Sequence, residues 1–508
     1  MASTLRAALI LAALASTQTY ASGFYFGDNG TKALMQGGAF AGEADDLTAI
    51  QYNPAGLANM AGFNFLIDGQ LLNHETAFTR QDNGFDPNNL KAPVPTTVRN
   101  TGGLFFLPFA GVSYGINLGT RRLTVSLGIY GPPSVGRYQY PIPDYTKNGA
   151  GTGYANTPKK SAANRYQLIN NDVIILYPTL ALAFQVHKRF QVGVSVQYVY
   201  STFSFKQTLY ADAGLTKPTS MGAEDPAYDS QVGVALTGRP NVTAIVGAMV
   251  KPLDNLSIGA SLRPQIPIRA DGKLTLDLGE RATDLGSSVI GDQATLALTL
   301  PLELRVGIHF RPISKLGLNL DYVYQGWQSI NELVLTPKDV SLKLGTAEPK
   351  PVAEFHIPKR WTYSNSVRFG ASFDVIKLLT LHAGAFYETG AAPDEQTGID
   401  FLHFNRVFVA GGVTVHLWKL DILAGFAGSP KVTKNVINSA VAAGRDDPTA
   451  APIFVGAGVY ESGGWIATLG IRGHFGGDPK EAPAPPIVPA PMEPAPAPVE
   501  APAPVTQT

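Results

Sequence analysis

The chain has no cysteine, and few of its 508 residues are charged. Without a thiol it can form no disulfide, no cysteine-ligated metal site and no thiolate nucleophile. Charged residues make up 15% of the chain, below the roughly 25% typical of soluble domains. The 39 basic residues balance 39 acidic ones, so the net charge gives no indication of a nucleic-acid partner. This composition favours an exported protein over a soluble enzyme.

Long hydrophobic runs are also missing after the first twenty residues. The uncharged stretch from Asn100 to Thr120 is broken repeatedly by glycine and by Pro108. No segment of the body therefore predicts a transmembrane helix, which would need about 20 consecutive apolar residues.

The first 21 residues have the pattern of a secretory signal peptide. Arg6 supplies a positive start, and Ala7–Ala15 forms a short apolar core. Thr19 and Ala21 then offer small residues at the positions that a signal peptidase reads. We predict cleavage after Ala21 and therefore a signal peptide over residues 1–21.

The body of the chain alternates apolar and polar residues with a period of two, which is the pattern of β-strands. In Phe190–Ser201 the aromatic and valine side chains fall on one face, opposite glutamine, glycine and serine. In the stretch Leu296–Phe310 we expect the even-numbered apolar residues to form one continuous face, opposite Glu303, Arg305 and His309.

Counting such segments predicts an all-β fold, a transmembrane antiparallel β-barrel of about fourteen strands. The segments lie near residues 63–79, 104–117, 122–131, 171–187, 190–208, 241–251, 255–278, 293–311, 315–335, 359–375, 378–390, 404–418, 419–429 and 461–475. Their apolar faces are about as long as a tilted strand needs to cross a bilayer, and several end in Tyr or Phe. Short turns alternate with long connections such as 209–240. Stacked soluble sandwiches are the disfavoured alternative, and we expect a barrel over residues 63–475.

Two segments lie outside the predicted barrel. Residues 22–62 do not alternate but are apolar enough to favour burial in the lumen, and Asn53-Pro54-Ala55 is typical of a helix start. Residues 476–508 repeat Pro-Ala-Pro, which predicts an extended or disordered periplasmic tail. The tail is either a passive spacer or a binding segment for a periplasmic partner.

The stretch GGAFAGEADDLTAIQYNPAGLANM resembles the N-terminal hatch of the FadL/TodX family of outer-membrane transport proteins. Small residues and an acidic pair are followed there by Asn-Pro-Ala. The matching positions are Gly38, Ala39, Ala41, Gly42, Asp45, Asp46, Asn53, Pro54 and Ala55. The resemblance implies that residues 22–62 form a hatch and that Gly23 and Phe24, at the mature start, contact a ligand in the lumen. The Pro-rich tail departs from the family, whose last strand usually ends the chain.

The resemblance also implies a transport mechanism. A hydrophobic ligand enters from outside, occupies a lumen pocket, and leaves sideways beside a kink in the third strand once the hatch shifts. Here that strand runs into Gly131-Pro132-Pro133. Because proline cannot donate to a strand ladder, a local break is expected there, although a strand simply ending in a loop fits equally well.

These observations predict passive uptake of a long-chain fatty acid or an aromatic hydrocarbon across the outer membrane. A structural or adhesive barrel with surface loops and an envelope-binding tail is the alternative. We expect a monomer in contact with outer-membrane lipid and lipopolysaccharide, with no nucleic acid, no cofactor, no metal and no catalytic residues.

Overall fold

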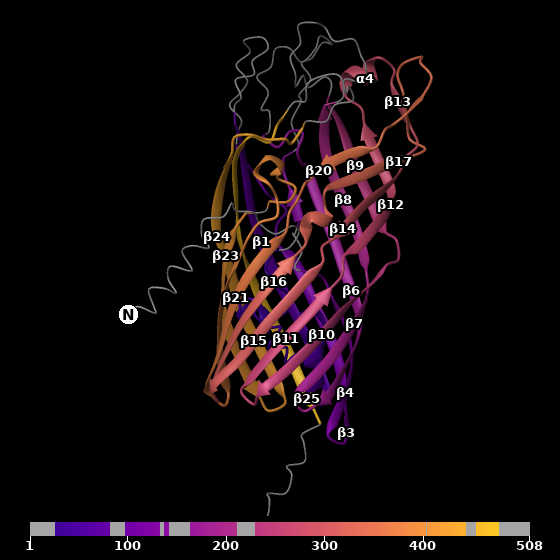
Figure 1. The fold of residues 1–508 in the computed structure, drawn as a ribbon. Coiled ribbons are helices and arrows are strands. Elements are labelled where there is room, and N and C mark those ends of the chain that lie inside the picture. The colour runs from indigo at the N-terminus through magenta and orange to yellow at the C-terminus, as the bar shows by residue number, and fades with distance from the viewer. Residues whose placement is uncertain are drawn as a thin grey trace, which may run out of the picture.

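The computed structural model of the chain describes residues 26–81, 97–132, 137–141, 163–210, 229–402, 404–442 and 454–476. Within these ranges the strands form a closed antiparallel barrel, and they tilt across its axis (Figure 1). The barrel closes where β25 (Gly458–Phe475) pairs with β1 (Gly62–Arg80) along the whole of β1 after Gly62.

A ring of fourteen strands passes through the half of the barrel that carries the short turns. In order around the ring these are β1, β3 (Phe105–Leu118), β4 (Arg121–Tyr130), β6 (Asn170–His187), β7 (Phe190–Tyr198), β10 (Val242–Leu253), β11 (Leu256–Arg263), β15 (Glu303–Ile313), β16 (Leu316–Gln325), β21 (Ser364–Ile376), β22 (Leu379–Glu388), β23 (Arg406–Leu417), β24 (Leu420–Val436) and β25. Each pairs with the next, and β25 returns to β1. The predicted fold class and strand number are therefore confirmed.

Above this ring several walls continue as separate strands after a short break. The upper strands are β2 (Val98–Arg99), β5 (Arg137–Gln139), β8 (Tyr200–Tyr210), β9 (Asp229–Gly238), β12 (Ile266–Asp277), β14 (Gln293–Leu300), β17 (Glu332–Lys338) and β20 (Phe355–Pro358). A small separate sheet consists of β13 (Ser288–Ile290), β18 (Ser341–Lys343) and β19 (Lys350–Pro351). The expected connection 209–240 was wrong in part, because β9 lies within it and extends the wall of β10.

The described helices are short. They are α2 (Thr31–Met35), α3 (Ala49–Tyr52), α4 (Glu280–Asp284) and the 3₁₀ helices η2 (Pro54–Asn59), η4 (Trp327–Ser329) and η5 (Asp394–Gln396). None of the helices in the described ranges has the length and apolarity needed to cross a bilayer.

Large apolar side chains cover the outside of the ring of fourteen strands. Ile67, Val367 and Leu469, for example, are 64%, 55% and 59% exposed. In a soluble protein these rows would be packed in a core. Since hydrocarbon cannot satisfy backbone N–H and C=O groups, a closed barrel is the form of sheet that can present such rows to lipid.

Candidate functional site

The inner wall changes from polar to apolar at the breaks between lower and upper strands. On β11 the buried inward residues include Ser261 and Arg263, whereas Ile266 and Ile268 face inward on β12 just above. The outward faces change in the opposite sense, because Leu262 is exposed below the break and Arg269 is exposed above it. The barrel thus has a lower tier with a polar interior and an upper tier with an apolar one.

The same break overturns the expectation that Leu296–Phe310 carries one continuous apolar face. Leu298 and Leu300 are buried inside the upper tier, whereas Val306 and Phe310 are exposed on the outside of the lower tier. Strand β14 ends at Leu300 and β15 begins at Glu303. Proline, which stands at 301, cannot donate to the ladder, and residues 301 and 302 belong to neither strand. Across this break the register with the neighbouring strands is kept, but the even-numbered side chains change face.

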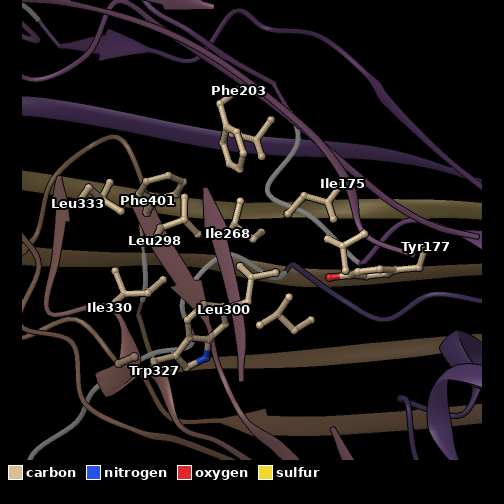
Figure 2. Close-up of a cluster of buried hydrophobic side chains, with 14 of the residues drawn as sticks. Ile175, Tyr177, Phe203, Ile268, Leu298, Leu300, Trp327, Ile330, Leu333 and Phe401 are labelled. Atoms are coloured by element: carbon tan, nitrogen blue, oxygen red, sulfur yellow. The ribbon is translucent and has the colours of Figure 1, made fainter. Parts of the chain in front are cut away.

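The apolar residues of the upper tier converge in what we call the chamber (Figure 2). They come from β6, β8, β12, β14, β17, η4 and nearby loops, and include Ile175, Tyr177, Phe203, Ile268, Leu298, Leu300, Trp327, Ile330, Leu333 and Phe401. Trp361 lies edge-on to both Trp327 and Phe401, with ring centroids 5.7 and 5.9 Å away. These side chains form a buried apolar cluster that offers contacts to a hydrophobic molecule.

Below the chamber, residues 26–61, which we call the N-terminal segment, fill the lower tier. Every residue from Phe26 to Ala58 is buried except Asp45. Met35 contacts inward positions of β23 and β24, and Gln36 does the same on β21 and β22. The segment contains α2, α3 and η2 and reaches the lower rim, where β1 begins at Gly62.

Glycines on the inner wall make room for this segment. A Cβ atom at Gly193 or Gly247 would collide with Pro54 or Asn53, and one at Gly259 would collide with the Ala41 carbonyl oxygen. The same holds around the wall, at Gly307, Gly370, Gly384, Gly412 and Gly425. This role of glycine was not predicted from the sequence; the signal was glycine at inward positions of successive strands.

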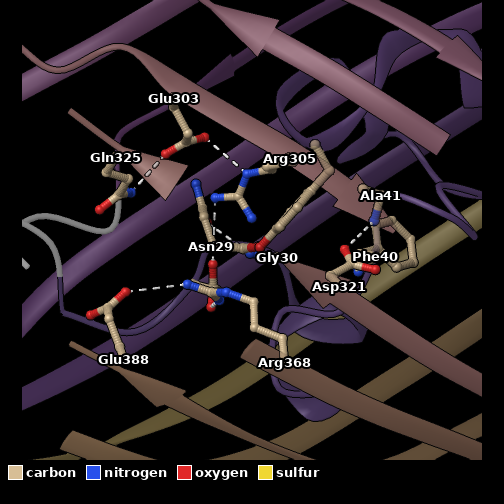
Figure 3. Close-up of polar contacts among 12 residues, drawn as sticks. Asn29, Gly30, Phe40, Ala41, Glu303, Arg305, Asp321, Gln325, Arg368 and Glu388 are labelled. Atoms are coloured by element: carbon tan, nitrogen blue, oxygen red, sulfur yellow. Dashed lines mark hydrogen bonds and ion pairs between the residues drawn. The ribbon is translucent and has the colours of Figure 1, made fainter. Parts of the chain in front are cut away.

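A network of buried ions forms the floor of the chamber (Figure 3). Asp28 of the N-terminal segment pairs with Arg368 of β21, and its other carboxylate oxygen lies 3.8 Å from Arg305 of β15. Glu303 accepts from Arg305 Nε at 2.9 Å, and Glu388 lies 3.5 Å from Arg368. All five side chains are at most 6% exposed. Such ions cost several kcal/mol each to desolvate, so their mutual pairing is what makes their burial tolerable.

The motif residues of the resemblance hold the N-terminal segment together and to the wall. The Asn53 amide donates to the carbonyl oxygens of Ala41 and Ala248, at 2.9 and 3.1 Å. Its side-chain oxygen accepts from Ala55 N, and Pro54 starts η2, so the predicted helix start is confirmed. The Asp46 carboxylate accepts from the Thr48 backbone N–H just before α3.

Lys32 is the electrostatic centre of the lower part of the segment. Its ammonium lies 2.9 Å from Glu43 and 2.6 Å from Asp45. Burial disfavours ionisation of Glu43, but the charge of Lys32, the nearby His309 and hydrogen bonds from Lys32 and Asn319 together outweigh burial and hold the pKa of that carboxyl below its usual range. Burial, with repulsion from Asp45, raises the pKa of Asp46. Beneath this group a cavity of about 880 Å³ opens at the lower rim, lined in part by Lys32, Glu43, Asp45 and Arg472.

The third strand of the ring is interrupted at the predicted place. Pairing of β4 with β6 stops at Tyr130↔Tyr177, and Gly131 and Pro132 have no strand partner. On the edge that faces β4, residues 173–176 of β6 have no described strand partner, and β5 resumes the contact at Asp172. The other edge of β6 stays paired, with β7 and then β8. Asn29 of the N-terminal segment donates from its side-chain amide to the Gly131 carbonyl oxygen at 2.8 Å. Neither Asn29 nor Asp28 stands in a motif that predicts a role for it.

Some predicted residues cannot be placed. Gly23, Phe24 and Pro133, the signal peptide and the tail after Gly476 lie outside the described residues. Within the described ranges, no group of three or more His, Asp or Glu side chains is arranged to hold a metal ion.

Comparison with known proteins gives a family and a set of similar folds. The sequence profile of the family described as "Outer membrane protein transport protein (OMPP1/FadL/TodX)" matches residues 12–443. A Pseudomonas aeruginosa FadL homologue of known structure is 16% identical, with a TM-score of 0.68 over 90% of this chain and 100% of the other. The Ralstonia pickettii toluene transporter TbuX is also 16% identical, with a TM-score of 0.58 over 89% and 99%. The Pseudomonas putida toluene transporter TodX is 13% identical, with a TM-score of 0.57 over 88% and 99%. No curated protein matches significantly.

Proposed function

The chain belongs to the OMPP1/FadL/TodX family of outer membrane transport proteins, and we propose that its cargo, a long-chain fatty acid or an aromatic hydrocarbon, passes through the chamber. Membership of a family of transport channels makes the protein an outer-membrane transporter of hydrophobic compounds. One observation carries the route: the chamber is apolar inside, although its outer face is polar. Because each CH₂ group gains about 0.8 kcal/mol on leaving water, an apolar lumen can take up such cargo where a wet channel would reject it.

The N-terminal segment acts as a hatch in this proposal. It closes the lower tier through polar contacts and through an apolar cluster in which Phe26 and Leu34 pack against the wall. The polar contacts can be exchanged for water or for other partners at a modest net cost. Asp45, Asp46 and Asn53-Pro54-Ala55 set its folded shape, as their contacts with Lys32, Thr48 and Ala41 support. Gly23 and Phe24 are proposed to contact the ligand where the segment begins.

The cargo leaves sideways through the wall beside Gly131-Pro132-Pro133. Support comes from the missing strand pairing above Tyr130 and from the bond of Asn29 to Gly131. Asp28 is held by Arg368 on the opposite side of the same segment. Residues 28 and 29 therefore connect the charged floor to the break, so that movement of the hatch withdraws a contact from the exit.

Three further proposals complete this picture. The protein works as a monomer without enzymatic activity, residues 1–21 are removed on export, and residues 476–508 extend into the periplasm.

Uptake by liposomes tests the proposed cargo and route. Liposomes that contain the protein should accumulate labelled oleate or toluene faster than empty liposomes, and the faster of the two compounds identifies the cargo class. Equal rates with and without protein for both compounds would refute the proposal.

The Asn53→Ala variant tests the hatch separately. It removes the amide that joins the two halves of the N-terminal segment and ties them to β10, while the wall of the barrel keeps all its strand pairs. Uptake should fall, and the heat-stable migration of the folded barrel on gels should be retained. Unchanged uptake in a folded barrel would remove Asn53 from the mechanism.

A further inference from the structure

The turn between β23 and β24 contains an unusual residue for its backbone conformation. Trp418 has a φ angle of +59°, in the left-handed region that a bulky side chain rarely adopts. At the equivalent place in the turn between β3 and β4, the chain uses Gly119, with a φ angle of +69°. A conformation of this kind costs a non-glycine residue about 1–3 kcal/mol, so a tryptophan here indicates that its side chain has a use.

That side chain lies in the open. Trp418 is 87% exposed, the highest value among the large apolar side chains of the described residues. The ammonium of Lys419 lies 4.9 Å from the Trp418 ring centroid and 6.0 Å from that of Phe475. Leu417 and Leu420, on either side of the turn, belong to the outward apolar surface. The turn thus stands where the lipid-facing surface ends.

Basic side chains surround the same rim. Each of the six short turns has at least one Lys or Arg in it or within three residues of it: Arg121, Arg122, Lys188, Arg189, Lys251, Arg311, Lys315, Lys377 and Lys419. The acidic residues in the same stretches are Asp254, Asp374 and Asp421, and Asp421 is paired with Arg472. No described carboxylate forms an ion pair with Lys419, Lys377 or Lys315.

We propose that Trp418 and Lys419 form a binding site for the headgroup of an anionic phospholipid in the periplasmic leaflet of the membrane. Both ends of the barrel wall, Gly62 and Phe475, lie at this rim, which is the periplasmic side for an even number of strands. An indole is stable at the boundary between hydrocarbon and headgroups, and a lysine beside it attracts a lipid phosphate. The surrounding basic turns favour an anionic lipid over a zwitterionic one. This site is independent of the transport route.

Quenching by brominated lipid tests the site in the full-length protein. The protein is reconstituted in phosphatidylcholine vesicles in which either phosphatidylglycerol or a fraction of the phosphatidylcholine is brominated. The signal of Trp418 is obtained by subtracting the fluorescence of the Trp418→Gly variant, which places the residue of Gly119 at this position and relieves the backbone. Trp418 should associate with phosphatidylglycerol about five-fold more strongly than with phosphatidylcholine, the size expected for one basic side chain at an anionic surface.

Two variants decide whether Lys419 is responsible. Lys419→Gln should bring the ratio of association with phosphatidylglycerol to association with phosphatidylcholine close to one, and so should salt at molar concentration. Lys273→Gln, the same change on an exposed lysine of the upper tier, should leave it unchanged. A ratio near one in the unaltered protein, or one that survives Lys419→Gln, would overturn the proposal. So would a preference that appears only in a chain ending at Gly476, because the acidic tail would then be the occupant.

Discussion

The lower and upper tiers of the barrel are built from continuous walls but enclose opposite kinds of interior. In the lower tier the outside is apolar and the inside holds ions such as Asp28 and Arg368. In the upper tier the outside carries charges such as Arg239 and Asp271, and the inside holds residues such as Leu298. At the breaks the polar and apolar faces of the wall change sides. The reason is that the outside of the lower tier meets lipid, whereas the outside of the upper tier meets water.

The two interiors also differ in how firmly their contents are specified. Ion pairs and glycine contacts require particular atoms at particular places, so the lower tier holds one peptide segment in one position. Apolar contacts are not directional and tolerate changes of shape, so the upper tier can receive molecules of different outline. We therefore assign closure of the barrel to the lower tier and uptake of cargo to the upper tier. Substitutions in one tier should change one of these properties without the other.

The largest effect is expected from Asp28→Ala. This substitution leaves Arg305 and Arg368 buried without their shared partner, and breaking a buried pair costs about 3–5 kcal/mol. The cost should displace the N-terminal segment and open the lower tier to ions, which is measured as conductance across planar bilayers. Asp254→Ala is the matched control, because that carboxylate is fully exposed in the turn between β10 and β11, outside the N-terminal segment. A closed channel in both variants would mean that the ions do not hold the segment.

A smaller effect of the same kind is expected from Gly259→Ala. The added methyl group meets the Ala41 carbonyl oxygen, and overpacking of this sort costs about 1–3 kcal/mol. The N-terminal segment should loosen, and hydrogen exchange of its amides should speed up while the wall strands stay protected. Gly233→Ala is the control, since the nearest atom there is Thr275 Cβ at 3.8 Å. Equal exchange in the two variants would show that the inner-wall glycines are dispensable.

The periodicity of the sequence was sufficient to predict the barrel fold, but it was insufficient to predict the division of the barrel into two tiers. Fourteen strands, their approximate places and the short turns follow from alternation, because alternation is local and each strand must cross the same thickness of lipid. Which face points inward is not local. The even-numbered leucines before and after Pro301 look like one row, and only the burial of the folded strands shows that this row changes face. The strand pairing keeps one register across the break, with Leu300 opposite Ile266 and Glu303 opposite Arg263.

The sequence motif of the N-terminal segment could be identified in advance, but the residues that its side chains contact on the barrel wall could not. Asn53-Pro54 was identified as a helix start from residue preferences alone, and it is one. Asp28 and Arg368 are 340 positions apart, so their pairing depends on closure of the whole barrel. The inner-wall glycines could be recognised in the sequence as glycine at inward positions of neighbouring strands. This pattern can be identified only when the register of strand pairing is known.

Leu298→Asn tests the upper tier without touching the lower one. A polar amide among apolar chamber residues should reduce uptake of hydrophobic cargo about ten-fold, because burying it without a partner costs on the order of 1–3 kcal/mol. Conductance should stay as low as in the unaltered protein, since the N-terminal segment is not involved. Ala297→Asn places the same side chain on the exposed outer face of β14 and should transport normally. If the two variants lost uptake equally, the chamber would not be the route.

The smallest effect concerns pH and the Lys32 group. The pKa of Glu43 is lowered from 4.5, so its contribution to stability is present above about pH 4.5 and is lost as the pH falls toward the lowered value. The pKa of Asp46 is raised, so its contribution runs the other way: it is complete below 3.8 and is lost as the pH rises through the raised value. In Asp46→Asn only Glu43 responds to acid, so amides of α2 should exchange faster in this variant, after correction for intrinsic rates, at about pH 3.5 than at neutral pH. This acid response should be smaller in the unaltered protein, because Asp46 compensates there for the protonation of Glu43, and Glu43→Gln should abolish it. The same acid response in Glu43→Gln as in the unaltered protein would show that the acid-sensitive group lies elsewhere. The chamber has no part in this response, so it should bind cargo equally at both pH values.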